Sequence, residues 1–365
     1  MTGMRYGLTI PYPDQPLAAQ AGLLREAAAA GYTDFWTGEA SGADAFTPLA
    51  LAAAWVPDVM LGTAIVPAFT RGPAVTAMSA AALAEAAPGR FVLGIGASSP
   101  AVVEQWNGIP FEHPFQRARD LLRFLRAALA GQKITHDYAS FRISGFRLDR
   151  PPENPPPVYV AALRPGMLRL AGTEGDGAIV NWLSADDVRT VVPHVGAAPV
   201  VARIFVCPSD DVQAIRALGR RMIAAYLNVP AYAAFQEWLG RGPALEGMWK
   251  AWQAGDRKAA LAAIPDQVVD DLIVHGPPER CREMIGRYVS NGVTVPVLAP
   301  VPVGMSYHDA ALKLAPLTGT HPSCSFLTNV RLAGAEEGLV AARRGRRRCG
   351  RWGHRVLTRD NTMRF

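Results

Sequence analysis

The chain has 365 residues, half of them hydrophobic, and carries a formal charge of +6 with an isoelectric point near 9.3. This length and composition favour one large α/β domain, or two smaller ones, with ample core. No apolar stretch reaches the roughly 18 residues of a membrane helix. Prolines interrupt the start of the chain where a signal peptide would be apolar, so we expect a cytoplasmic protein. The four cysteines are scattered without a C-x-x-C pair, which argues against a disulfide framework or a zinc site.

The excess positive charge lies in one segment. Residues 318–365 contain ten arginines, no lysine and three acidic residues, so the rest of the chain is nearly neutral. An arginine run can neutralise nucleic-acid phosphates, but this one lacks the interleaved aromatic residues of specific readers. We therefore expect a catalytic domain over 1–317 and a disordered C-terminal extension over 318–365, without a nucleic-acid partner.

Apolar segments and helical patterns alternate along the catalytic domain. Strands are expected at residues 6–10, 34–39, 59–67, 90–96, 157–163, 176–182, 199–206 and 293–301. Helices are expected at residues 17–30, 44–55, 73–87 and 114–129, from about Gly166, over 210–275, and from Pro277 to a left-handed stop at Asn291 and Gly292. A small hairpin over 133–144 and a proline-stiffened loop over 147–157 interrupt the alternation.

This alternation predicts the architecture. Most of the eight strands are continuous apolar runs, which are typical of parallel strands buried on both faces. Eight β-then-α units suit a (β/α)₈ TIM barrel with insertions. A doubly wound open sheet is the alternative that periodicity alone leaves open.

The stretch Gly94-Ile95-Gly96-Ala97-Ser98-Ser99 is one residue short of the G-x-G-x-x-G dinucleotide fingerprint. That fingerprint needs a third glycine and a helix that begins inside the motif. Ser99 replaces the glycine, and Pro100 follows at once. The dinucleotide interpretation is therefore disfavoured. Either the backbone amides of Ala97, Ser98 and Ser99 face an anion, or the glycines merely turn the chain.

Barrel enzymes carry their chemistry at the carboxyl ends of the strands. Glu39 closes the second strand and either takes part in catalysis or caps the next helix. Thr63, Ala64 and Ile65 in the third strand either let a flat ring pack against backbone or form a simple bulge. Arg71, in the loop beyond, is either an anion partner or an ordinary exposed arginine.

Two more strand ends carry candidate binding residues. Arg164 and Gly166 lie between the fifth strand and a helix start, where backbone amides, the helix dipole and the guanidinium can hold a phosphate. Asn181 and Trp182 close the sixth strand and offer an amide and a large ring to a substrate pocket.

Several chemistries have no motif in the chain. There is no G-x-S-x-G elbow, no H-E-x-x-H and no P-loop. The seven histidines fall mostly in loops, helices or the C-terminal segment, and none clearly ends a strand, which disfavours a metal-dependent hydrolase. No metal ligand set is predicted. Anion-binding features without an evident nucleophile indicate that a bound cofactor carries the reaction.

Four blocks of the sequence, residues 31–53, 61–83, 89–114 and 157–177, occur in an order that resembles the luciferase-like monooxygenase superfamily. More narrowly, they resemble its actinobacterial branch that uses coenzyme F420, a 5-deazaflavin. The resemblance covers roughly residues 4–305. It implies a TIM barrel and hydride transfer between the deazaflavin C5 and a small organic substrate.

The resemblance also implies roles for particular residues. In related members a bulge in the third strand, often with a non-proline cis peptide, backs the flavin ring, and it maps to Thr63, Ala64 and Ile65. The acid of the second strand maps to Glu39, which would position the substrate or relay a proton. The remaining cofactor-binding positions are Gly96, Ala97, Ser98 and Ser99 after the fourth strand, and Ala162, Leu163, Arg164 and Gly166 in the phosphate loop.

The chain departs from the sugar-phosphate dehydrogenases of this superfamily. They have a histidine where this chain has Ala40, and a glutamate where it has Ser99. Their substrate is therefore not carried over. Leu163 and Arg164 also make the phosphate loop bulkier than its common glycine-rich form.

Two alternatives stay open. The first is an FMN-dependent monooxygenase on the same barrel, which would use O₂ and reduced flavin from a partner reductase. The second is a cofactor-binding protein without turnover. Candidate partners are a small-molecule substrate, a flavin or F420 reductase and a second copy of the chain as a homodimer.

Overall fold

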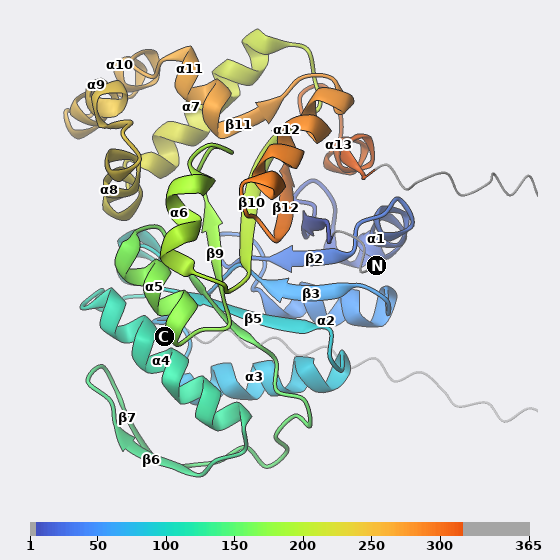
Figure 1. Ribbon diagram of the computed structural model, residues 1–365, viewed down its shortest axis with the longest axis vertical. Helices are drawn as coiled ribbons and strands as arrows, with labels where there is room; N and C mark the ends of the chain where they lie inside the picture. Colours follow the sequence, from blue (N-terminus) through green and yellow to red (C-terminus); the bar gives the residue numbers. More distant parts are fainter. Residues whose placement is uncertain (1–4, 317–365) are drawn as a thin grey trace, which may run out of the picture. The chain divides into compact units, whose positions relative to one another are not determined.

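The computed structural model describes residues 5–316, and these fold around a closed barrel of parallel strands (Figure 1). The barrel strands, in chain order, are β1 (Gly7–Thr9), β2 (Asp34–Thr37), β3 (Met60–Thr63), β5 (Phe91–Gly96), β8 (Val158–Ala161), β9 (Gly177–Asn181), β10 (Val200–Cys207) and β12 (Val295–Pro300). Each neighbours the next, and β12 pairs with both β10 and β1, which closes the ring. The predicted (β/α)₈ barrel is therefore confirmed, and the open sheet is excluded.

Helices cover the barrel between its strands. They are α1 (Gln20–Ala29), preceded by the 3₁₀ turn η1 (Leu17–Ala19), then α2 (Phe46–Trp55), α3 (Pro73–Ala86), α4 (Pro114–Leu129), α5 (Pro165–Thr173), α6 (Val188–Val195), α12 (Pro278–Ser290) and α13 (Tyr307–Leu314). The sequence did not predict α6 or α13. Gly292 adopts a φ of 117° just beyond α12, as expected of a helix stop, whereas Asn291 keeps a right-handed conformation.

The predicted hairpin is present as β6 (Ile134–Asp137) and β7 (Arg142–Phe146), which pair antiparallel. It packs against α4, beside which it runs in Figure 1. The Phe124 ring of α4 contacts the rings of Tyr138, Phe141 and Phe146. The hairpin thus covers one side of α4.

Residues 210–275, predicted as one helical region, form five helices and a strand. They are α7 (Val212–Leu227), α8 (Pro230–Trp238), α9 (Gly242–Gln253), α10 (Arg257–Ala262), α11 (Asp266–Leu272) and β11 (Ile273–His275). The prediction was wrong at its end, because β11 pairs with β10 from Phe205 to Cys207. β9 pairs with β10 only as far as Arg203, so the edge beyond is open to a new strand. These helices gather on one side of β10 (Figure 1) around an apolar core of their own.

The indole ring of Trp36 fills much of the barrel interior. Trp36 is 1% exposed and lies over two glycines, Gly7 and Gly62. A Cβ at Gly62 would sit 2.3 Å from the Trp36 ring, and a Cβ at Gly7 would sit 3.1 Å from it. Tyr159 and Ile179 belong to the same interior cluster. The barrel below its mouth is therefore a packed core.

The extension expected over 318–365 lies outside the described residues. Among the helices that the structure describes, none is long and apolar enough to cross a membrane.

Substituting Gly62 by alanine should destabilise the barrel. The added methyl group must displace the rigid Trp36 ring, and overpacking of this kind costs about 1–3 kcal/mol. Gly22→Ala is the matched control, because nothing lies within 4 Å of its added Cβ in α1 and alanine favours a helix by about 0.5–1 kcal/mol. Thermal unfolding should show a lower midpoint for Gly62→Ala and an unchanged or higher one for Gly22→Ala; equal midpoints would contradict the packing account.

Candidate active site at the carboxyl end of the barrel

A bulge follows β3 on the carboxyl side of the barrel. β3 pairs with β5 through Gly62 and Val92, and β4 (Val66–Pro67) resumes the pairing at Val66 and Ile95. Between these pairs, the β3–β4 side has three residues and the β5 side has two. The extra residue lies in Thr63–Ile65, and the Ala64–Ile65 peptide is cis. The bulge that the family resemblance implies is present; its contact with a ring stays a prediction.

The Thr63 hydroxyl holds the bulge to β5. It accepts from the Gly94 amide at 2.7 Å and donates to the Gly94 carbonyl at 2.8 Å, which replaces the missing backbone ladder bonds. A Cβ at Gly94 would sit 1.9 Å from the Thr63 carbonyl oxygen, so only glycine fits there. On the other side, the Glu39 amide donates to the Ile65 carbonyl at 3.1 Å. Both neighbouring strands therefore fix the bulge.

Gly94 and Gly96 do not turn the chain, because both lie within β5. The turn comes later, at Ser98, which has a φ of 66°. Ser99 continues it: its hydroxyl accepts from the Val102 amide at 3.4 Å, and the chain enters a π-helical turn, η2 (Ala101–Gln105). The glycines instead permit close approach. The hypothesis that they merely turn the chain was wrong.

Gly96 separates the bulge from the predicted phosphate loop. A Cβ at Gly96 would sit 2.8 Å from the Ala161 Cβ and 3.2 Å from the Ile65 Cδ1. β3, β5 and β8 are consecutive in the barrel. The Thr63–Ile65 stretch and the loop that contains Arg164 therefore lie on the same rim, with one glycine-bearing strand between them.

The mouth of the barrel is lined mostly by small residues. Side chains alternate along a strand, so the positions two residues beyond the packed interior also point inward. They are Thr9, Gly38, Ala64, Gly96, Ala161, Asn181, Arg203 and Ala299. Six of these are no larger than threonine. The arrangement fits a flat ring resting on the bulge, because on that side Ile65 is the one large side chain of Thr63–Ile65 and it packs down against Gly96 and the interior cluster.

The phosphate-loop candidates surround the start of α5. Arg164 is the exposed N-cap residue, in an extended conformation, and Pro165 begins the helix. Only the Phe115 ring edge lies within 4 Å of a Cβ built at Gly166, at 3.9 Å, so the space beside this backbone is open. The first amides of a helix have no intrahelical acceptor and attract anions. Of the other two candidates, Ala162 is buried, its amide donating to the Ile179 carbonyl at 2.9 Å, and Leu163 packs on the apolar core.

Glu39 lies in a charged cluster at the rim. Its Oε1 accepts from the Ala45 amide at 3.1 Å and from the Arg71 guanidinium at 2.9–3.0 Å. Arg71 also lies 3.3 Å from Asp44. Asp44, not Glu39, accepts the first α2 amides, those of Phe46 and Thr47. Burial raises the pKa of Asp44, but hydrogen bonds from Thr47 and Phe46 and the charge of Arg71 outweigh it, so the pKa lies below its ordinary value.

Asn181 and Trp182 lie on the opposite side of the mouth. The Asn181 amide donates to the Tyr232 hydroxyl of α8 at 3.1 Å. Trp182 has a φ of 54°, is 1% exposed, and packs against Phe205 with ring centroids 4.3 Å apart. Its indole belongs to the core of the helical insertion rather than to an open pocket wall.

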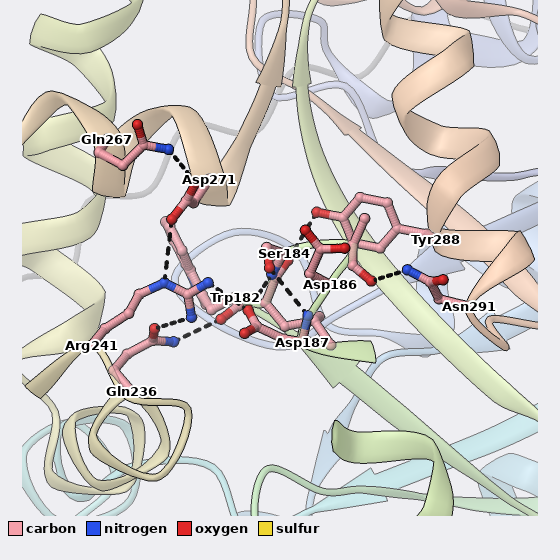
Figure 2. Close-up of polar contacts among 12 residues, drawn as sticks. Trp182, Ser184, Asp186, Asp187, Gln236, Arg241, Gln267, Asp271, Tyr288 and Asn291 are labelled. Atoms are coloured by element: carbon pink, nitrogen blue, oxygen red, sulfur yellow. Dashed lines mark hydrogen bonds and ion pairs between the residues drawn. The ribbon is translucent and has the colours of Figure 1, made fainter. Parts of the chain in front are cut away.

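Side chains from distant segments hold the loop that follows Trp182 (Figure 2). Gln236, which is fully buried, donates to the Trp182 carbonyl at 2.7 Å, and the Tyr288 hydroxyl donates to the Leu183 carbonyl at 2.9 Å. Arg241 donates to Gln236 at 3.2 Å and to the Asp187 carboxylate at 2.7 Å. The network thus joins α8 and α9 to the start of α6.

Sequence reasoning missed Gln236, Arg241 and Tyr288, because they lie more than fifty residues from the loop they hold. It also placed no histidine at a strand end, whereas His275 ends β11, where it bonds to Asp270 at 3.0 Å. No group of three or more metal-binding side chains occurs within residues 5–316.

Neither described cysteine is an activated nucleophile. Burial raises the pKa of Cys207 to about 11 and that of Cys281 to about 12, so both stay protonated near neutral pH. The candidate site therefore offers backbone, a carboxylate, amides and guanidinium groups, and its residues can bind and orient a cofactor that performs the chemistry.

The family model for the luciferase-like monooxygenase matches residues 4–295. The chain belongs to this family. It is therefore an oxidoreductase, and the resemblance of the four sequence blocks is confirmed.

Curated relatives span nearly the whole described chain. The 5,10-methylenetetrahydromethanopterin reductase of Methanolobus tindarius is 26% identical over 324 residues, which cover 85% of this chain and 98% of the relative. The "Putative coenzyme F420-dependent oxidoreductase Rv3520c" of Mycobacterium tuberculosis is 27% identical over 329 residues, 81% of this chain and 95% of the relative. Among solved structures, the coenzyme F420 dependent tetrahydromethanopterin reductase from Methanopyrus kandleri aligns with a TM-score of 0.71 at 22% identity, covering 86% of this chain and 98% of that one.

Replacing Thr63 by valine should loosen the bulge. The change keeps the side-chain shape but leaves the buried Gly94 amide without its acceptor, which costs about 1–3 kcal/mol. Thr76→Val is the control: Thr76 is equally buried, but its hydroxyl bonds the Gly72 carbonyl, which already accepts from the Thr76 amide. Thermal unfolding should separate the two variants, and similar midpoints would argue against the role of the hydroxyl.

Replacing Gln236 by leucine should release the Trp182 backbone. The buried Trp182 carbonyl then loses its donor, and we expect a loss of about 1–3 kcal/mol in the free energy of unfolding, with a shift in tryptophan fluorescence. The control is Gln267→Leu, an exposed residue bonded to Asp271 in the same region (Figure 2), which should change stability by at most about 0.5 kcal/mol. A Gln236 variant as stable as this control would contradict the role of the network.

Proposed function

We propose that the protein is an F420-dependent oxidoreductase that transfers hydride between the deazaflavin and a small organic substrate. The observation that carries the proposal is the bulge at Thr63–Ile65, which Gly94 and Gly96 allow to lie against β5 in a mouth lined by small residues. The mycobacterial relative whose name refers to coenzyme F420 supports the choice of cofactor. When bound, the deazaflavin would supply a carbon that accepts or donates hydride.

The residues of the chain would bind and orient this cofactor. The backbone of Ala64 and Ile65 would support the flat ring, and Gly96 would let the Ile65 and Ala161 side chains pack closely against β5 beside it. The Gly166 amide and the Arg164 guanidinium would hold the phosphate, since a helix N-terminus and an arginine fork both favour anions. Amides of Ala97, Ser98 and Ser99 would border the ring from the loop after β5.

Glu39 would act at the edge of the site. Arg71 and the Ala45 amide bind one of its oxygens, Oε1, and leave Oε2 without a hydrogen-bond partner among residues 5–316. Oε2 could then accept a hydrogen bond from a substrate and orient it, while Asn181 borders the substrate from the opposite side. Trp182 would shape the pocket through its backbone and its packing rather than by direct contact.

An FMN-dependent monooxygenase is the second candidate, because the family model describes luciferase-like monooxygenases. A flavin has the same three-ring outline and a phosphate, so the bulge and the α5 amides would serve it equally. Such an enzyme would receive reduced flavin from a partner reductase and consume O₂.

Titration with F420 and with FMN, followed by cofactor fluorescence, tests the proposal. We expect F420 to bind at micromolar concentration and more tightly than FMN. A chain that binds FMN alone, and consumes O₂ with reduced FMN, would establish the second candidate instead. Binding of neither cofactor would overturn both.

The phosphate loop has its own test. Replacing Arg164 by methionine removes one charge-assisted hydrogen bond and should weaken F420 binding by about tenfold. Arg169→Met, an exposed arginine later in α5, is the matched control and should leave the affinity unchanged. If both variants bind like the wild type, the phosphate lies elsewhere.

A further inference from the structure

One inward position of the mouth carries a cation. Arg203 lies on β10, paired with Asn181 of β9 and Val297 of β12. It follows Val201, a residue of the barrel interior, by two positions, so its side chain starts inward. In the ring of eight strands, β10 is four strands from β3 in either direction. Arg203 therefore faces the Thr63–Ile65 bulge across the mouth.

Arg203 has no carboxylate partner. Among residues 5–316, no carboxylate oxygen lies within 4.0 Å of its guanidinium, and its buried Nε has no hydrogen-bond acceptor. The centroid of the Phe205 ring lies 5.0 Å from the guanidinium carbon, which gives the cation an aromatic contact. The opposite end of the barrel differs, because there Arg5 is paired with the fully buried Asp34.

The groups around Arg203 are neutral donors and acceptors. The Tyr232 hydroxyl accepts from the side-chain amide of Asn181, the β9 residue that pairs with Arg203. Thr9, at the same end of the barrel, adds a buried hydroxyl that finds no hydrogen-bond partner within residues 5–316. Asp14 accepts from the Tyr307 amide at 3.2 Å and makes no ion pair with Arg203. Arg203 thus brings to the mouth a positive charge that no carboxylate of the described residues pairs.

A partly buried guanidinium without an anion is costly, and its planar fork matches a carboxylate. We propose that Arg203 binds the carboxylate of the substrate, so that the enzyme acts on acidic organic molecules. The hydroxyls of Thr9 and Tyr232, at the same end of the barrel, would donate to the same group. The inference rests on the proposed function, because it puts the reacting carbon between Arg203 and a ring on the bulge.

Binding of benzoate and benzamide to the cofactor-free protein tests the proposal without turnover. These probes share a ring and differ in charge. Isothermal titration should show that the wild type binds benzoate about 10- to 100-fold more tightly than benzamide, which is the range expected for charge-assisted hydrogen bonds from one guanidinium. Arg203→Met should abolish the preference, and Arg203→Lys should keep only part of it. A wild type without the preference, or an Arg203→Met variant that retains it, would overturn the proposal.

Thermal unfolding separates binding from structural support. Because Arg203 has no carboxylate partner among residues 5–316, Arg203→Met should not lower the unfolding midpoint, whereas Arg5→Met, which leaves the buried Asp34 unpaired, should lower it clearly. A large drop for Arg203→Met would mean that the arginine serves the fold, and would count against the proposal.

Titration of Arg203→Met with F420 identifies the source of the anion. Unchanged F420 affinity supports a substrate carboxylate, whereas a large loss would assign Arg203 to a negative group of the cofactor and overturn the proposal. If the wild type binds no F420 but still prefers benzoate through Arg203, the proposed function fails while the anion site stands.

Discussion

The site depends on the exchange of two hydrogen bonds between the Thr63 hydroxyl and the Gly94 backbone. A strand with an extra residue would leave a buried amide and carbonyl of its neighbour unpaired, and this hydroxyl satisfies both. The exchange requires glycine at position 94, since a Cβ there would overlap the Thr63 carbonyl. Thr63 and Gly94 together therefore convert a regular strand into the bulge at the barrel mouth.

The bulge can stay open at the mouth because the barrel interior beneath it is filled by side chains. Trp36 occupies the space above Gly7 and Gly62, so the core is sealed beneath the mouth. Small inward residues above this plug leave room without exposing the core to solvent. The part of the barrel filled by the Trp36 ring stabilises the fold. The part beyond it, lined by small residues, is available to a ligand.

The architecture was predictable because local patterns determine it. Each barrel strand lies within an apolar segment of the sequence, and eight such segments suit a barrel. Only the pairing of β12 with both β10 and β1 excludes the open sheet. The strand β11 was missed because only the open edge of β10 makes residues 273–275 a strand. Gln236 and Arg203 were missed for a related reason. The role of a buried glutamine or an inward arginine depends on which partners the fold brings close to it, and the sequence does not show these partners.

The two halves of the mouth are built differently. From β2 to β8 the lining is backbone and small residues, which suits a flat group that is held by shape. Around β9 and β10 it consists of large side chains, and the Trp182–Phe205 contact joins it to the separate core of the insertion. Since α8 supplies Tyr232 and Gln236 to this half, changes in the insertion can alter the lining around β9 and β10. The bulge is bonded to Thr37 and Glu39 at the end of β2 and to Gly94 of β5, so such changes leave its support intact.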